Sequence, residues 1–119
     1  MAKQEELMKI AVPTANGMLC MHFGHCERMT LIEVDPESKV IQKQEELTPP
    51  PHEPGLLPRW LAEKGATAII AGGMGQRAQA LFTERNIQVI VGAPSDTPEN
   101  LVKLFVSGNL QSGTNVCDH

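Results

Sequence analysis

A proline-rich segment, residues 48–55, divides this chain into two halves whose hydrophobic patterns differ. Prolines at this density interrupt helices and strands alike, so the segment predicts a loop. Before it, three segments have the pattern of strands, at residues 8–12, 28–34 and 39–47. Pro13 predicts the end of the first strand. The turn-forming residues 35–38 predict that the other two strands form a hairpin.

Behind the loop, helical spacing alternates with short apolar runs. Helices are predicted from Leu57 to Lys64 with Gly65 as the stop, over 76–86, and from Thr97 to Gly108. Buried strands are predicted at 67–71 and 87–91. This order predicts an α/β fold with a five-stranded mixed sheet flanked by helices, similar to the ribonuclease H-like arrangement. Its second half is a βαβ unit with parallel strands.

The length of 119 residues allows one domain with one core. We expect a polar extension at 1–7, a single α/β domain over 8–108 that would hold any ligand, and a polar tail at 109–119. A monomer is expected at this size.

The composition excludes several classes of protein. A net charge of −4 and an aromatic content of 3% oppose a nucleic-acid binder, which needs a basic face or stacking rings. Residues 1–7 are charged and no apolar run follows that would make a signal peptide. No run is long enough to span a membrane. We therefore expect a cytoplasmic chain whose three cysteines are reduced.

A glycine-rich turn, Gly72-Gly73-Met74-Gly75-Gln76-Arg77, joins a predicted strand to a predicted helix. Backbone N–H groups at a helix N-terminus favour an anion, and glycine lets a bulky ligand approach them. Arg77 would add positive charge. Alternatively, the glycines serve only the dihedral angles of a tight turn. The turn is neither a Walker A loop nor a complete dinucleotide-binding motif.

Two further segments carry candidate metal ligands. The first places Cys20, His22, His25 and Cys26 within seven residues, which favours a soft metal or sulfide over a structural zinc site. The histidines could also be surface groups, and Cys20 a small core residue. The second is the chain end, with Cys117 and His119. We interpret His52 as part of a spacer.

The assumed strand order connects these segments. If strand 8–12 is parallel to strand 67–71, then Asn16, the loop at 22–26 and the turn at 72–75 share the edge where parallel strands end. Ligands of open α/β sheets bind at that edge.

His22-Phe23-Gly24 after a first strand, Gly73-Met74-Gly75 before a central helix, and a closing Cys-x-His together resemble the dinitrogenase iron–molybdenum cofactor biosynthesis family. The resemblance spans most of residues 8–119. It implies a ribonuclease H-like protein that carries or inserts metal–sulfur cofactors. Similarity to members from sulfate-reducing bacteria implies a non-covalently held molybdenum–copper sulfide cluster. The wider family implies iron–molybdenum cofactor precursors and cofactor-assembly or acceptor proteins as partners.

The residues expected to hold the cofactor are His22, Phe23, Gly24, His25, Cys26, Gly73, Met74, Gly75 and Arg77. Relatives often differ at His25 and Cys26, so these two would tune the cofactor. Direct metal ligation is expected, if anywhere, at Cys26, Cys117 and His119.

We expect no catalytic role. A nuclease would need carboxylates on the first strand, which has none, and a thiol redox protein would need C-x-x-C. Two alternatives remain open: a copper or zinc buffer that uses the Cys20–Cys26 side chains directly, and a protein-interaction module without cofactor.

Overall fold

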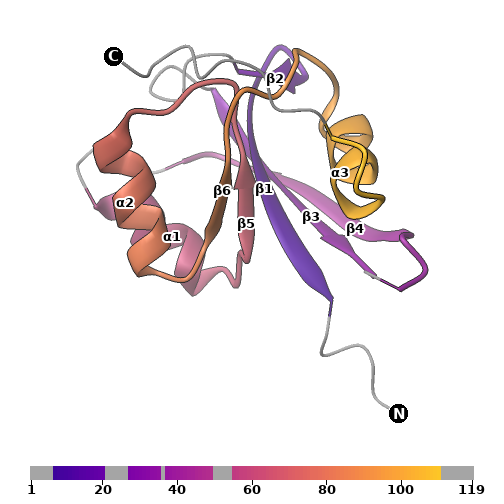
Figure 1. Ribbon diagram of the computed structural model, residues 1–119, viewed down its shortest axis with the longest axis horizontal. Helices are drawn as coiled ribbons and strands as arrows, with labels where there is room; N and C mark the ends of the chain where they lie inside the picture. The colour runs from indigo at the N-terminus through magenta and orange to yellow at the C-terminus, as the bar shows by residue number, and fades with distance from the viewer. Residues whose placement is uncertain (1–6, 21–26, 36, 50–54, 111–119) are drawn as a thin grey trace.

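The computed structural model describes residues 7–20, 27–35, 37–49 and 55–110 as one α/β sandwich (Figure 1). Its sheet has the order β4-β3-β1-β5-β6, and a two-residue strand, β2, pairs with β1 alone. The strands are β1 (Met8–Ala15), β2 (Met18–Leu19), β3 (Arg28–Val34), β4 (Ile41–Leu47), β5 (Ala68–Ile70) and β6 (Gln88–Ile90). The helices are α1 (Leu56–Glu63), α2 (Gln76–Glu84) and α3 (Pro98–Val106). The predicted fold class is confirmed, with β2 as an addition to the five expected strands.

Helices cover both faces of the sheet. In Figure 1, α1 and α2 lie on one side and α3 lies on the other. Successive residues of β1 supply the two cores in turn, because side chains alternate along a strand. Ala11 packs in the core under α1 and α2 with Leu61 and Phe82. Ile10 packs in the core under α3 with Leu101.

The strand directions confirm the expectation that the first strand and the strand before the glycine turn are parallel. β1 runs parallel to β5, with Ile10 opposite Ala68 and Ala11 opposite Ile69. β5 and β6 are also parallel, whereas β3 is antiparallel to β1 and to β4. No helix among the described residues has the length and apolar character of a membrane span.

The prediction that Pro13 ends the first strand is wrong. β1 continues through Pro13 to Ala15 and stays paired with β3. The Lys9 carbonyl faces β5, where it accepts from the Thr67 N–H at 2.7 Å, so Pro13, four residues on, faces the same way. Pairing with β5 has ended by then, so the sheet needs no N–H from the proline. The Pro13 carbonyl instead accepts from the Cys20 N–H at 2.8 Å.

The second strand of the hairpin begins later than predicted. Lys39 has a left-handed backbone, with φ of 61°, and its N–H donates to the Asp35 carbonyl at 2.7 Å. Lys39 therefore belongs to the turn. A register shift between Glu33 and Val34 then brings Ile41 into the sheet as the first residue of β4.

Two residues assigned to the tail by the sequence close the end of α3. The backbone turns at Gly108, with φ of 79°, and the Asn109 N–H donates to the Leu104 carbonyl at 2.8 Å. Leu110 packs against the core under α3. This is the bonding pattern of a glycine-terminated helix end.

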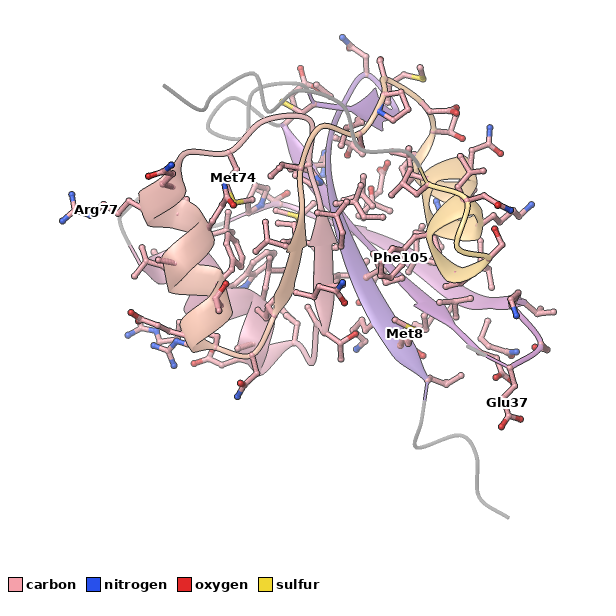
Figure 2. The ribbon with its side chains drawn as sticks, in the orientation of Figure 1. Met8, Glu37, Met74, Arg77 and Phe105 are labelled. Atoms are coloured by element: carbon pink, nitrogen blue, oxygen red, sulfur yellow. The ribbon has the colours of Figure 1, made fainter. Side chains whose placement is uncertain are left out.

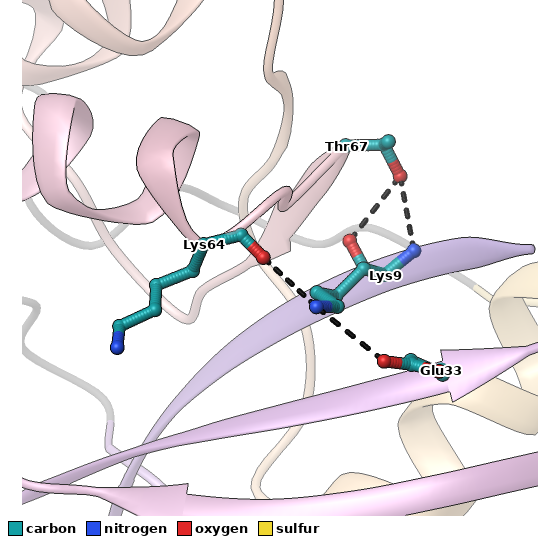
Figure 3. Close-up of polar contacts among 4 residues, drawn as sticks. All are labelled: Lys9, Glu33, Lys64 and Thr67. Atoms are coloured by element: carbon teal, nitrogen blue, oxygen red, sulfur yellow. Dashed lines mark hydrogen bonds and ion pairs between the residues drawn. The ribbon is translucent and has the colours of Figure 1, made fainter.

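Lys9 joins three elements at the amino end of β1 (Figure 3). Its Nζ donates to the Lys64 carbonyl at the end of α1 at 2.8 Å and lies 3.4 Å from the Glu33 carboxylate of β3. A cation at the carboxyl end of a helix complements the helix dipole and the last carbonyl groups. The contact therefore anchors α1 to the sheet.

Lys9→Met should lower the free energy of unfolding by about 1–2 kcal/mol, because it removes a charged donor from a helix end and an ion pair. Urea denaturation would measure the loss. Arg59→Met is the control, since Arg59 is an exposed cation on α1 and its loss should change stability by at most about 0.5 kcal/mol. Equal effects of the two variants would contradict the anchoring role of Lys9.

Candidate functional site

The carboxyl ends of β1, β5 and β6 lie at one edge of the sheet, the upper edge in Figure 1. From β1 the sheet continues toward β3 on one side, and from β5 it continues toward β6 on the other. A sheet whose strand order reverses in this way has its ligand-binding crevice at the reversal point, beyond the strand ends. The candidate site is therefore the edge above β1 and β5.

A two-residue hairpin joins β1 to β2 at this edge. Its turn residues are Asn16 and Gly17, with φ angles of 57° and 79°. β2 pairs with β1 beyond the point where β5 ends, and the Leu19 N–H donates to the Asp96 carbonyl at 2.9 Å. The hairpin thus ties the end of β1 to the loop before α3.

The predicted cradle residues His22, Phe23, Gly24, His25 and Cys26 lie outside the described residues, as do His52, Cys117 and His119. The two residues that border the span 21–26 are both bonded to the end of β1. The Cys20 N–H donates to Pro13, as noted, and the Glu27 N–H donates to the Thr14 carbonyl at 2.9 Å. Cys20 itself is buried, at 7% exposure.

The glycine turn follows β5 at the same edge. The Gly92 N–H donates to the Gly72 carbonyl at 3.0 Å, and the Ala93 N–H donates to the Ala71 carbonyl at 3.2 Å. These bonds continue the pairing of β5 and β6 into the two loops. The turn is therefore held by the sheet, and the expectation that it shares an edge with Asn16 is confirmed (Figure 1).

The glycines of this turn are not explained by left-handed backbone. Among the described glycines, five have positive φ, and those at positions 72, 73 and 75 are not among them. Gly75 has φ of −65° and ψ of 158°, a conformation open to any residue. A Cβ built on Gly75 would meet no heavy atom within 4 Å outside its chain neighbours. Neither dihedral angles nor packing in the described structure require glycine there.

Gly75 is also the N-cap of α2. Because glycine has no side chain, this N-cap accepts no side-chain hydrogen bond from the first N–H groups of the helix. No acidic residue lies in the first turn of α2. The α3 terminus is different, because Thr97 Oγ1 accepts from the Asn100 N–H at 3.3 Å and Glu99 lies in the first turn. The α2 terminus therefore has neither a hydroxyl at its N-cap nor a carboxylate in its own first turn to complement the positive end of its dipole.

The comparison with known proteins places these features in a family. Residues 6–108 match the family model described as "Dinitrogenase iron-molybdenum cofactor". The chain belongs to this family. Protein MJ0580 of Methanocaldococcus jannaschii is 32% identical over 111 residues, which cover 89% of this chain and 92% of MJ0580.

Solved structures share the fold. The crystal structure of PH0822 has a TM-score of 0.79 and 25% identity, covering 88% of this chain and 94% of PH0822. The apo form of the orange protein from Desulfovibrio gigas has a TM-score of 0.69 and 20% identity, covering 92% of this chain and 95% of the orange protein. At that identity the likeness to the orange protein concerns the fold.

Met74 in the glycine turn and Arg77 in the helix after it differ in burial. Met74 is fully buried and lies between α2 and the sheet in Figure 2, where it joins the core under α1 and α2. Its carbonyl accepts from Gln79 Nε2 at 2.9 Å. Its role in the cradle stays a prediction, and what the structure shows is a core side chain. Arg77 is exposed and points away from the sheet (Figure 2).

Two features of the candidate site were not predicted from the sequence. Gln79 fastens the turn from within α2, since its N–H also donates to the Gly75 carbonyl at 3.1 Å. The Asn16-Gly17 hairpin carries a strong sequence signal, because both residues favour positive φ. Gln79 carries no comparable signal in the sequence.

Other potential sites do not compete at this edge. Within the described residues, no group of three or more His, Cys, Asp or Glu side chains could hold a metal ion. An open cavity of about 500 Å³ lies beside α3 and the β3–β4 turn, lined by Lys39, Asp96, Asn100, Lys103, Leu104 and Ser107. The Asp96 carboxylate in it accepts from the Thr97 N–H at 2.7 Å and from Asn100 at 3.1 Å, which is a helix-capping role.

Proposed function

We propose that this protein binds an anionic metal–sulfur cluster, without covalent attachment, at the carboxyl edge of its sheet, and handles it in cofactor assembly or metal storage. Catalysis forms no part of the proposal. The observation that carries it is Gly75, a glycine at a helix N-terminus that neither its dihedral angles nor the packing of the described residues requires. Space for a ligand explains such a glycine.

The chemistry of the turn fits an anion with sulfide faces. A helix N-terminus presents N–H donors and the positive end of the dipole. A carboxylate in the first turn would oppose an anion, and α2 has none there. Arg77, exposed in that first turn, adds a cation. A thiometallate held by such donors needs no bond from the metal to a protein thiolate.

Family membership supports the choice of cluster, since the family takes its name from the iron–molybdenum cofactor. We assign the cradle to Gly73 and Gly75, with His22, Phe23 and Gly24 as further contacts. His25 and Cys26 would tune the cluster, and Cys117 and His119 would cover it. A molybdenum–copper sulfide cluster is the proposed ligand, with an iron–molybdenum cofactor precursor as the variant within the same chemistry. The proposed setting is the cytoplasm, and partners would be cofactor-assembly or acceptor proteins.

Titration of the purified protein with tetrathiomolybdate and copper(I) tests the proposal. We expect stoichiometric molybdenum and copper after desalting, together with sulfide-to-metal charge-transfer bands in the visible spectrum. The same analysis should be made on protein isolated from its native source.

Two outcomes would contradict the proposal. Uptake of copper or zinc alone, lost in Cys26→Ser, would identify a metal buffer that uses its side chains directly. Under our proposal that variant only weakens cluster binding. Failure to take up any thiometallate would leave a protein-interaction module.

A further inference from the structure

β4 is an edge strand, and its outward backbone groups can be identified from the register. The backbone N–H and C=O groups of Lys9 point toward β5, so those of Ile10 point toward β3. Those of Ile32, the partner of Ile10, point toward β1. Leu31 and Glu33 then face β4, where they lie opposite Glu45 and Lys43. Lys43 and Glu45 therefore face inward. The N–H and C=O groups of the alternate residues, at positions 44 and 46, face outward. The register shift next to position 42 interrupts the alternation there.

Within the described part of the chain, β4 pairs only with β3. Gln44 and Glu46 are exposed, and they carry a row of outward donors and acceptors. Such a row is a template for another strand.

The sequence of β4 is complementary to itself when two copies run antiparallel about Gln44. Gln44 then lies opposite the partner's Gln44. Gln44 faces outward, so this pair can exchange two backbone hydrogen bonds. The alternating direction of the backbone groups along the strand therefore permits this register.

The side chains agree with the same register. Lys43 lies opposite the partner's Glu45 on the face that carries α1 and α2, and symmetry repeats this ion pair. Directly opposed charges of opposite sign stabilise a pair of strands.

The neighbouring registers are disfavoured by charge. A shift toward the amino end of the strand places Lys43 opposite the partner's Lys43. A shift toward the carboxyl end places Glu45 opposite the partner's Glu45. Like charges directly opposite each other destabilise strand pairs. Lysine on an edge strand usually opposes pairing with a further strand. In the register about Gln44, however, Lys43 lies opposite the carboxylate of the partner's Glu45.

We propose that the β4 edge is a self-association surface, on which a second copy of this chain binds antiparallel about Gln44 and joins the two sheets into one. The occupant is a second copy because the charge pattern of the strand complements itself. This departs from the monomer expected from size. β4 and β6 lie at opposite edges of the sheet, so the glycine turn before α2 stays open in each copy. The association does not depend on the proposed cluster.

Sedimentation equilibrium over a concentration series tests the proposal with charge variants. Glu45→Lys should raise the dimer dissociation constant at least about tenfold, because both symmetric pairs become Lys–Lys. The double variant Lys43→Glu with Glu45→Lys restores opposite charges and should return the constant to within about threefold of the parent. The ion pairs are exposed, so added salt should weaken the parent dimer.

Backbone variants test the register independently of charge. Gln44→Pro removes an outward N–H that the chain's own sheet does not use, and it should abolish the dimer while the monomer stays folded. Gln44→Ala is the matched control, because it too removes the bond from Gln44 Nε2 to Glu99 but keeps the N–H. A parent that stays monomeric at every concentration, a double variant that fails to recover, or a Gln44→Pro variant that still dimerises would overturn the proposal.

Discussion

Gly75→Asp should make the protein slightly more stable and abolish its uptake of thiometallate. Asp is a better N-cap than glycine and complements the helix dipole, so the free energy of unfolding should rise by about 0.5 kcal/mol. A Cβ at Gly75 would meet no heavy atom of the described residues within 4 Å outside its chain neighbours. The carboxylate would occupy the N–H donors of α2 and repel an anion, so we expect at least a tenfold loss of affinity, an estimate of order ~1.4 kcal/mol in binding. Titration with tetrathiomolybdate and copper(I), and urea denaturation, give the two readouts.

A matched control separates the local effect from net charge. Ser38→Asp adds the same charge at the exposed β3–β4 turn, away from the carboxyl edge of β1 and β5 (Figure 1). It should leave uptake unchanged. Gly75→Ser caps the helix without a charge and should lie between the parent and Gly75→Asp. Full binding by Gly75→Asp would remove the glycine turn from the site.

Phe82→Ala should lower the free energy of unfolding by about 3–5 kcal/mol, because the cavity it leaves adds to the lost burial. Phe82 is fully buried under α2 and packs with Leu61 of α1 and Ile69 of β5. The loss would be a large part of the stability of a domain of this size, which is typically about 5–15 kcal/mol. Urea denaturation at constant temperature measures it.

The controls for Phe82 lie on the same helix. Phe82→Leu leaves a smaller cavity and should cost less than the alanine variant. Glu84→Ala changes an exposed residue of α2 and should stay within about 0.5 kcal/mol of the parent. A loss below about 1 kcal/mol in Phe82→Ala would mean that α2 is not packed on the sheet through this ring.

The second half of the fold could be predicted closely from the sequence because its signals agree. Short apolar runs that are followed by glycine give β5 and β6. Helical spacing gives α1, α2 and α3, and Thr97-Pro98 marks the start of α3 as a cap should. In this half each helix or strand is bordered by a residue that predicts where it starts or where it ends.

The first half was less predictable because its signals depend on pairing partners. Pro13 interrupts a strand only where a neighbour needs its N–H, and the early end of β5 is not visible in the sequence of β1. Lys39 has a left-handed backbone although it is not a glycine, so its residue type does not predict the turn. The turn at Asn16 and Gly17 was predictable, since both residue types favour it.

For the candidate site, the sequence predicted the position of the glycine turn at the sheet edge and not the surroundings of its side chains. Gly73 and Gly75 could be selected because glycine between a strand and a helix has few explanations. Met74 attracted attention as a soft ligand, but an apolar residue beside a buried strand is also a core residue. Only the packing of α2 on the sheet shows its burial. Hydrogen bonds between segments far apart in the sequence, such as that from Leu19 of the β1–β2 hairpin to the Asp96 carbonyl, depend on the topology of the fold and cannot be predicted from local sequence.

The Lys9 contact has a consequence for how this chain can change over evolution or in the laboratory. It anchors α1 at the amino end of β1, whereas the glycine turn lies beyond the carboxyl ends of the strands. Substitutions around Lys9 can therefore raise or lower the melting temperature and leave the affinity for the proposed cluster unaltered. Selection for heat tolerance and selection for a different ligand would act on opposite ends of the sheet, so neither need constrain the other.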